Sequence, residues 1–165
     1  MKTLILTTVM TLLMASMSPA QGAMEEEHDH DHHHHNHRNE FGMANSLVYL
    51  GADDEFSYGL HLHFVRNIGE SRFGAGLGYE RIFDEHKHNT IGLVGSFRAT
   101  ERLIFNLSPG IAFEGAETDH LSFAMHIEST YEFQIRKLHI GPLVEFAFDA
   151  EDYHISLGLH LGLGF

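Results

Sequence analysis

The chain has 165 residues, which is enough for one domain, and it contains no cysteine. The missing cysteine excludes a disulfide scaffold, a cysteine-linked lipid anchor and thiolate chemistry. The formal net charge of −13, with histidine counted as neutral, disfavours nucleic acid as a partner and favours cations, because phosphate binding needs a basic face.

Residues 1–20 have the order of features that is typical of a secretory signal peptide. Lys2 is followed by an apolar run from Leu4 to Met14 and then by small residues up to Ala20. The apolar run is too short for a membrane anchor, and no basic stop-transfer cluster follows it. We therefore expect cleavage after Ala20 or Gly22.

Residues 21–38 form a tail of acids and histidines with almost nothing to bury, so we expect it to be disordered. It carries seven of the sixteen histidines: His28, His30, His32, His33, His34, His35 and His37. Neutral imidazole is a good ligand for transition metals, and a flexible tail would bind them with little selectivity. We expect Zn²⁺ first, or Ni²⁺, Cu²⁺ or Co²⁺. The alternatives are a hydrophilic spacer and an expression tag; interleaved aspartates and the native-looking signal argue against a tag.

From residue 39 onward, apolar and polar residues alternate. The clearest case is the final stretch, YHISLGLHLGLGF, in which every odd position is apolar and every even position is histidine, serine or glycine. Successive side chains of a strand point to opposite faces, so one face here is wholly apolar. The stretch is about thirteen residues long, which suffices to cross a bilayer when tilted.

The same alternation recurs along the chain and predicts about eight strands joined as hairpins. The first strand is the weakest, because its alternation is broken at Asn45. Tight turns are expected at Gly69, at residues 100–102 and at residues 136–137. Longer loops are expected at residues 53–55, 84–88, 114–119 and 149–152. The predicted strands cover about residues 41–50, 56–64, 73–80, 91–98, 103–114, 121–133, 139–148 and 153–165.

An even number of meandering strands can close into a barrel and hide its edges. The non-apolar face is rich in glycine, serine, histidine and glutamate and nearly free of lysine. That composition is unusual for a surface in water, but it suits the crowded interior of an eight-stranded barrel. The mean hydropathy of −0.15 does not contradict a membrane barrel, because only alternate residues are apolar. The sequence therefore favours an all-β, antiparallel up-and-down transmembrane barrel over a soluble one.

Residues 39–165 resemble the small eight-stranded outer-membrane barrels of Gram-negative bacteria. The resemblance rests on the signal peptide, the amphipathic meander and the terminal row Leu159, Leu161, Leu163 and Phe165. It implies that Phe165 belongs to the barrel-assembly signal, and that the exterior contacts outer-membrane lipid and lipopolysaccharide. One departure is the absence of tryptophan. The interfacial belts would be built from phenylalanines and from Tyr49, Tyr58, Tyr79, Tyr131 and Tyr153.

An even strand number places both termini on one side, which would be the periplasm. The four longer loops then face outward, and all of them are acidic. The opposite end carries most of the basic residues: Arg66, Arg72, Arg98, Arg102, Arg136 and Lys137. The acidic rim either serves only loop solubility or concentrates divalent cations, including those that bridge lipopolysaccharide.

Six polar residues of the inward face are expected near mid-barrel depth: His61, His63, His126, Glu128, Glu145 and His160. Three histidines and a carboxylate would make a credible zinc or nickel site. The alternative is a polar plug of histidine–glutamate pairs that only satisfies the interior.

The sequence also contains the spacing His-x-Ser at His154–Ser156 and at His120–Ser122, with Glu145 as an orienting acid. This pattern resembles that of outer-membrane lipid A deacylases. Any polar strand face yields it by chance, and these residues are expected to face the lumen, so we do not expect an enzyme.

The sequence thus predicts an outer-membrane barrel with a periplasmic metal-binding tail, acting in metal acquisition or homeostasis. A periplasmic or inner-membrane metal transporter would be its partner. The alternatives are a structural or stress-response barrel and, third, a lipid A-modifying hydrolase.

Overall fold

A computed structural model describes residues 37–115, 121–150 and 152–165. The predicted signal peptide and the tail histidines from His28 to His35 lie outside the described residues. In the described part of the chain, no helix is long and apolar enough to cross a membrane. The strands are β1 (Asn39–Leu50), β2 (Glu55–Asn67), β3 (Phe73–Ile82), β4 (His88–Arg98), β5 (Leu103–Glu114), β6 (Ser122–Tyr131), β7 (Phe133–Ile135), β8 (Leu138–Phe148) and β9 (Tyr153–Gly164).

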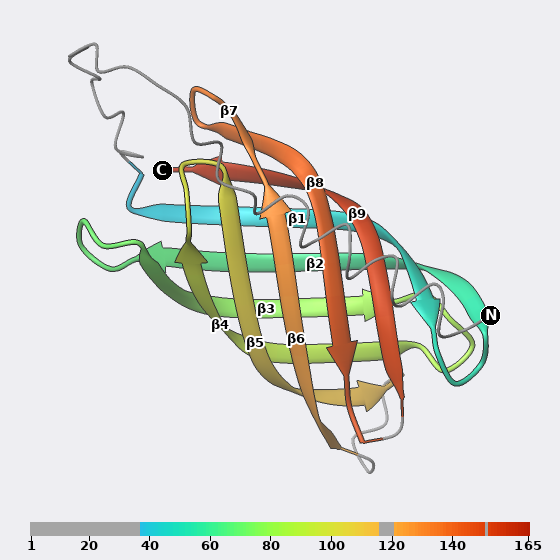
Figure 1. Ribbon diagram of the computed structural model, residues 1–165. Helices are drawn as coiled ribbons and strands as arrows, with labels where there is room; N and C mark the ends of the chain where they lie inside the picture. The colour runs from blue at the N-terminus through green and yellow to red at the C-terminus, as the bar shows by residue number, and fades with distance from the viewer. Residues whose placement is uncertain (1–36, 116–120, 151) are drawn as a thin grey trace, which may run out of the picture. The chain divides into compact units, whose positions relative to one another are not determined.

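The strands close into an antiparallel barrel. Each strand pairs with the next along the chain, except that β6 pairs with β8 rather than with β7, and β1 pairs with β9 to form the closing seam (Figure 1). The short strand β7 continues β6, because both pair with β8 in one register, Thr130↔Leu143 and Phe133↔Ile140. The break between them falls opposite Pro142, which has no N–H to donate to the ladder. With β6 and β7 counted as one, the barrel has eight strands, and the predicted fold is confirmed.

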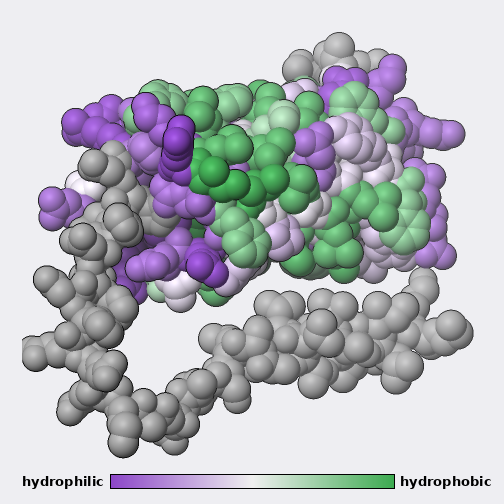
Figure 2. All heavy atoms as spheres, turned by 90° about the horizontal axis from the view of Figure 1, so that it is seen from above, coloured by the Kyte–Doolittle hydropathy of each residue, from purple (hydrophilic) through white to green (hydrophobic). Residues whose placement is uncertain are grey.

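The alternation of the sequence becomes an apolar exterior and a polar interior. Leu157 in β9 is 58 % exposed, whereas its neighbour Ser156 is 1 % exposed. On the face shown in Figure 2, hydrophobic residues cover the middle of the exterior, and hydrophilic residues gather toward the two ends. This is the reverse of a barrel built for water, and it confirms the predicted assignment of the two faces.

The first strand extends further than the sequence indicated and has no irregularity in space. β1 begins at Asn39 rather than near Phe41. Asn45 keeps its place in the outward row, where its side-chain oxygen accepts a hydrogen bond from the Tyr58 hydroxyl. The apparent break in the pattern is therefore a polar residue on the outer face, and it does not shift the register.

The two ends of the barrel differ, and we name them here. The loop end carries the connections β1–β2, β3–β4, β5–β6 and β8–β9; the turn end carries the three short turns and both ends of the barrel sequence. The predicted turns at Gly69 and at residues 136–137 are present there, with left-handed backbone at Gly69 (φ 59°) and Arg136 (φ 61°).

Aromatic rings cluster near both ends of the exterior, as the sequence led us to expect. Tyr49 packs against Phe56 and Tyr58 against Phe83 near the loop end. Further rings pair near the turn end, namely Phe64 with Phe165, Phe73 with Phe97, and Tyr131 with Phe133. Such belts suit the two interfaces of a bilayer.

Side chains fill the interior in layers. Near the loop end lies a small apolar cluster of Val48, Leu50 and Ile82. Below it, toward the turn end, the lumen is occupied by histidines and glutamates. The polar column therefore begins behind an apolar layer.

Candidate metal centre

The lumen holds an unusual concentration of buried imidazoles and carboxylates. Six histidines and five glutamates point inward, and all are buried except His154, which is partly exposed. They are His61, His63, His126, His139, His154 and His160 with Glu40, Glu80, Glu128, Glu132 and Glu145. Each comes from the inward row of its strand, apart from Glu132, which lies at the break between β6 and β7.

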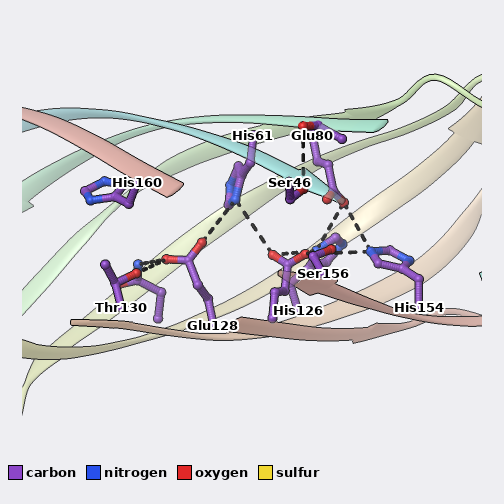
Figure 3. A network of polar contacts seen from close by, with 12 residues as sticks. Ser46, His61, Glu80, His126, Glu128, Thr130, His154, Ser156 and His160 are labelled. Carbon is purple, nitrogen blue, oxygen red and sulfur yellow. Dashed lines mark hydrogen bonds and ion pairs between the residues drawn. The ribbon is translucent and has the colours of Figure 1, made fainter. Parts of the chain in front are cut away.

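Four of these residues form a compact set nearest the loop end, which we call the loop-side group. It consists of Glu80 from β3, His126 from β6, Glu145 from β8 and His154 from β9. One ligand atom from each residue lies within 4.8 Å of the others. In Figure 3, His126 and His154 converge on the carboxylates that face them.

Four histidine–carboxylate distances in the loop-side group, counting both oxygens of Glu145, are close to the edge length of a tetrahedral zinc site. His126 Nδ1 lies 3.3 Å from Glu80 Oε2 and 3.4 Å from Glu145 Oε2. His154 Nε2 lies 3.5 Å from Glu80 Oε2 and 3.7 Å from Glu145 Oε1. Zinc bonds of about 2.0–2.1 Å to nitrogen and oxygen imply ligand-to-ligand edges of roughly 3.3 Å in a tetrahedron. The four side chains could hold such an ion with only small movements.

Two polar atoms of the group have no hydrogen-bond partner among the described residues. They are His154 Nε2 and Glu145 Oε2, both fully buried atoms. Their nearest polar neighbours are the ion-pair contacts at 3.4–3.7 Å, which are long for hydrogen bonds, so a bound ion or water would satisfy them better. Neither Glu80 nor Glu145 has an ion pair with a lysine or arginine in the part of the chain described.

A cavity of about 20 Å³ adjoins the loop-side group and gives it room and access. Its lining includes Glu80, His126 and His154 inside and Asp149 and Asp152 at the rim. One water needs about 10–15 Å³, so the cavity can admit a single water or ion. The acidic rim places negative charge at the mouth through which a cation would enter.

His61 joins the loop-side group to the centre of the lumen. Its Nδ1 lies 3.3 Å from Glu128 Oε2 and 3.7 Å from Glu145 Oε2. Glu128 is further held by Asn106, whose side-chain N–H donates to Oε1 at 2.7 Å, and by the Thr130 hydroxyl at 3.3 Å. Glu128 Oε1 is thus held by two donors, whereas Glu128 Oε2, His61 Nδ1 and Asn106 Oδ1 make no hydrogen bond among the described residues.

A second set lies toward the turn end, and we call it the turn-side group. It comprises two sets that share Glu40, namely Glu40 with His63 and His160, and Glu40 with Glu132 and His139, and His160 Nδ1 also contacts Glu132. His139 Nδ1 lies 3.0 Å from Glu40 Oε2 and 3.4 Å from Glu132 Oε2, and His160 Nδ1 lies 3.3 Å from Glu132 Oε1. The rings of His63 and His160 are stacked, with centroids 5.2 Å apart.

The six lumen residues expected from the sequence all face inward, but they are divided among three layers. His126 and Glu145 belong to the loop-side group, and His61 and Glu128 lie between the groups. His63 and His160 belong to the turn-side group. Of the tail histidines, only His37 is described, and it lies beside the turn-side group, with its ring centroid 6.2 Å from that of His139.

Sequence reasoning missed five residues of the two groups: Glu40, Glu80, Glu132, His139 and His154. All five had a usable signal, since they lie in the inward rows of the predicted alternating strands or continue them, and Glu132 lies between the outward Tyr131 and Phe133 of the predicted strand 121–133.

The serine–histidine pattern considered for a hydrolase has a different geometry from a catalytic triad. The Ser156 hydroxyl donates to Glu145 Oε1 at 3.2 Å, so it is bonded to the acid rather than to an imidazole. Ser156 is 1 % exposed and faces the lumen, away from any lipid around the barrel. His120 lies outside the described residues.

No protein-family model matches the chain, and no curated protein matches it either. Among solved structures, the chain is similar to Neisserial surface protein A, with a TM-score of 0.56 and 11 % identity over 77 % of this chain and 96 % of that one. It is also similar to the Yersinia pestis outer-membrane protein Ail in a phospholipid bilayer nanodisc, with a TM-score of 0.52 and 11 % identity over 77 % and 99 % of the two chains. A de novo designed transmembrane β-barrel matches with a TM-score of 0.52 and 11 % identity over 75 % and 95 %.

These similarities establish the fold of the chain. It is a small transmembrane-type β-barrel of the kind found in outer-membrane proteins. At 11 % identity they carry no information on what the lumen residues bind.

Proposed function

We propose that this protein lies in the outer membrane of a Gram-negative bacterium and binds divalent transition metal ions, zinc first, in metal acquisition or homeostasis. Outer-membrane lipid and lipopolysaccharide would surround the apolar exterior. The tail with its histidines from His28 to His37 would collect or hand on the same ions, with a periplasmic or inner-membrane metal transporter as the next partner.

The loop-side group is the observation that carries the proposal. Two carboxylates and two imidazoles from four strands converge at distances of 3.3–3.7 Å, with a cavity beside them. Imidazole nitrogen and carboxylate oxygen are ligands that zinc prefers, and two carboxylates would neutralise the charge of a divalent ion.

The competing function is a structural or stress-response barrel in which histidine and glutamate only satisfy one another. That reading accounts well for the central layer, where Glu128 accepts two further hydrogen bonds. It accounts less well for the loop-side group, where two glutamates face two histidines beside a cavity and, in the described part of the chain, neither glutamate pairs with a lysine or arginine. The bonding of Ser156 to Glu145 also weighs against a lipid A hydrolase.

The test is a zinc titration by calorimetry on the full mature chain in detergent micelles. A tail-silent variant, in which His28, His30 and residues 32–35 are replaced by serine, removes most of the tail's contribution. We expect it still to bind Zn²⁺. Glu80→Gln and His154→Gln should each weaken that binding about tenfold or more, since even loss of an outer-shell partner of a metal ligand costs this much. Tetrahedral Co²⁺ absorption in the visible range gives an independent readout of the geometry.

Thr130→Val is the matched control. It removes a buried lumen hydrogen bond to Glu128 without touching the loop-side group, so it should leave zinc affinity unchanged. A tail-silent variant that binds no zinc, or that binds it equally well with and without Glu80, would disprove the loop-side site. Absence of zinc binding would leave the polar-plug reading, and binding that does not depend on Glu80 would place the ion elsewhere in the chain.

A further inference from the structure

The turn-side group has a donor set that the loop-side site does not use. Glu40 and Glu132 present two carboxylates, and His63, His139 and His160 present three imidazoles. His139 Nδ1 is 3.0 Å from Glu40 Oε2 and 3.4 Å from Glu132 Oε2, which again approximate the edges of a small metal polyhedron.

Two buried imidazoles of this group have ring nitrogens that make no hydrogen bond in the described part of the chain. They are His63 Nδ1 and His160 Nε2, whereas His160 Nδ1 meets Glu132 Oε1 in an ion-pair contact at 3.3 Å. His160 is 1 % exposed and His63 is 4 % exposed. A cavity of about 20 Å³ is lined by Glu40, His63, Glu132 and His160, which is again room for one ion or water.

Two glycines make the room. A Cβ on Gly42 would lie 2.7 Å from His160 Nε2 and closer still to the His63 ring, and a Cβ on Gly162 would lie 3.1 Å from Glu40 Oε1. The two glycines therefore leave no side chain where the imidazoles and the Glu40 carboxylate approach the backbone.

His37, the last histidine of the tail sequence, lies beside the same group. The backbone oxygen of His37 accepts a hydrogen bond from the Asn67 side chain at 2.8 Å, and the His37 ring packs where Gly164 has no side chain. Its centroid is 6.2 Å from that of His139. An ion carried by the tail would thus be delivered next to the turn-side ligands.

The two groups differ in their charge, because an arginine lies beside the turn-side group. Arg98 lies with its Nη1 3.5 Å from Glu132 Oε2, so part of the negative charge of the turn-side carboxylates is already balanced. In a poorly solvated interior, a fixed positive charge at this range opposes a second cation strongly. The turn-side group should therefore hold a divalent ion less tightly than the loop-side group does.

We propose that the turn-side group is a second divalent-metal site, weaker than the loop-side site because of Arg98, and positioned to exchange its ion with the tail. This inference rests on the proposed metal-binding function and adds to it a second site and the residue that sets its affinity.

The experiment uses the tail-silent full chain and Zn²⁺ alone, titrated by calorimetry with heat-modifiable gel mobility as the check on folding. We expect two ions with separate affinities. Glu40→Gln, which keeps the shape of the side chain, should abolish the weaker site and leave the tighter one. Arg98→Gln should strengthen the weaker site by about tenfold or more, a gain that misfolding cannot produce.

The outcomes separate the two ideas. One bound ion that is lost with Glu80→Gln and unaffected by Glu40→Gln would overturn the turn-side site and leave the proposed function standing. If two ions bind and Arg98→Gln changes neither affinity, Arg98 does not set the affinity of the turn-side site, and this proposal is wrong. No bound zinc at all in the tail-silent chain would refute both lumen sites, and with them the observation that carries the proposed function.

Discussion

Replacing Gly42 with alanine tests how tightly the interior of the barrel is packed. The new Cβ would lie about 1 Å too close to the His63 ring, within 2.5 Å of its Cε1, and 2.7 Å from His160 Nε2. Both rings are buried and stacked on one another at 5.2 Å, so neither can swing aside without disturbing the other. Inserting a methyl group into a full core typically costs about 1–3 kcal/mol.

Part of that cost is offset, because alanine is better than glycine in a strand by roughly 0.5–1 kcal/mol. We therefore expect Gly42→Ala to lower the free energy of unfolding by about 1–2 kcal/mol. The assay is urea unfolding of the barrel in lipid vesicles, followed by circular dichroism and tyrosine fluorescence, since the chain has no tryptophan.

Gly95→Ala is the control, since the nearest atom to its added Cβ is the Leu107 carbonyl oxygen at an ordinary 3.7 Å. It should be neutral or slightly stabilising. If Gly42→Ala unfolds at the same urea concentration as the unmodified chain, the His63 and His160 rings are not packed as described. The turn-side cavity beside these two rings would then not have the shape described.

Three further predictions concern the seam, the tail and a loop. Deleting Phe165 should impair assembly into the membrane, because it removes an outward aromatic ring and the two backbone hydrogen bonds between Phe165 and Asn39; normal heat-modifiable mobility of the deletion variant would contradict this. A peptide of residues 25–37 should bind Zn²⁺ near neutral pH and lose it below about pH 6, since imidazole must be neutral to ligate, and calorimetry that finds equal binding at pH 5 would exclude histidine as the ligand. In the β3–β4 loop, partial burial raises the pKa of Asp84, but hydrogen bonds from the backbone and ring of His88 outweigh it and hold that pKa below its ordinary value. The resulting stabilisation is present above the ordinary carboxyl range and is lost as pH falls through the lowered pKa. The protection factor of the His88 amide, which corrects for the intrinsic pH dependence of hydrogen exchange, should therefore fall in acid, and Asp84→Asn should remove that dependence.

The sequence predicted the barrel well, because each strand side chain has only two directions to choose from. Once residues such as Leu157 and Ser156 are assigned to opposite faces, the whole meander follows, and burial confirms that assignment. The interruption at Glu132 was not predicted, since it depends on what lies across the sheet from it, Gly141 and Pro142, rather than on its own neighbours.

The lumen partners were harder to predict than the faces. His160 and His61 both pair with Ala44 in the hydrogen-bond ladder, one on each side of β1. They nevertheless join different layers, because the strands of a small barrel tilt and a row of paired residues climbs along the axis. Counting residues from the loop ends assumes that paired residues lie at the same depth in the barrel. That assumption predicted a single site, whereas the structure has two groups.

The seam between β1 and β9 also dictates when the barrel can form. It joins residues from opposite ends of the barrel sequence, from Glu40↔Gly164 to Leu50↔His154. Contacts so distant along the chain are slow to form, because the chain loses the entropy of closing the whole loop before the hydrogen bonds of the seam begin to stabilise it. Until β9 arrives, both edges stay open, and an open edge in hydrocarbon leaves unpaired N–H and C=O groups that cost several kcal/mol each. A chain cut short before residue 153 therefore has no stable place in a bilayer, and only a finished polypeptide can enter it and stay.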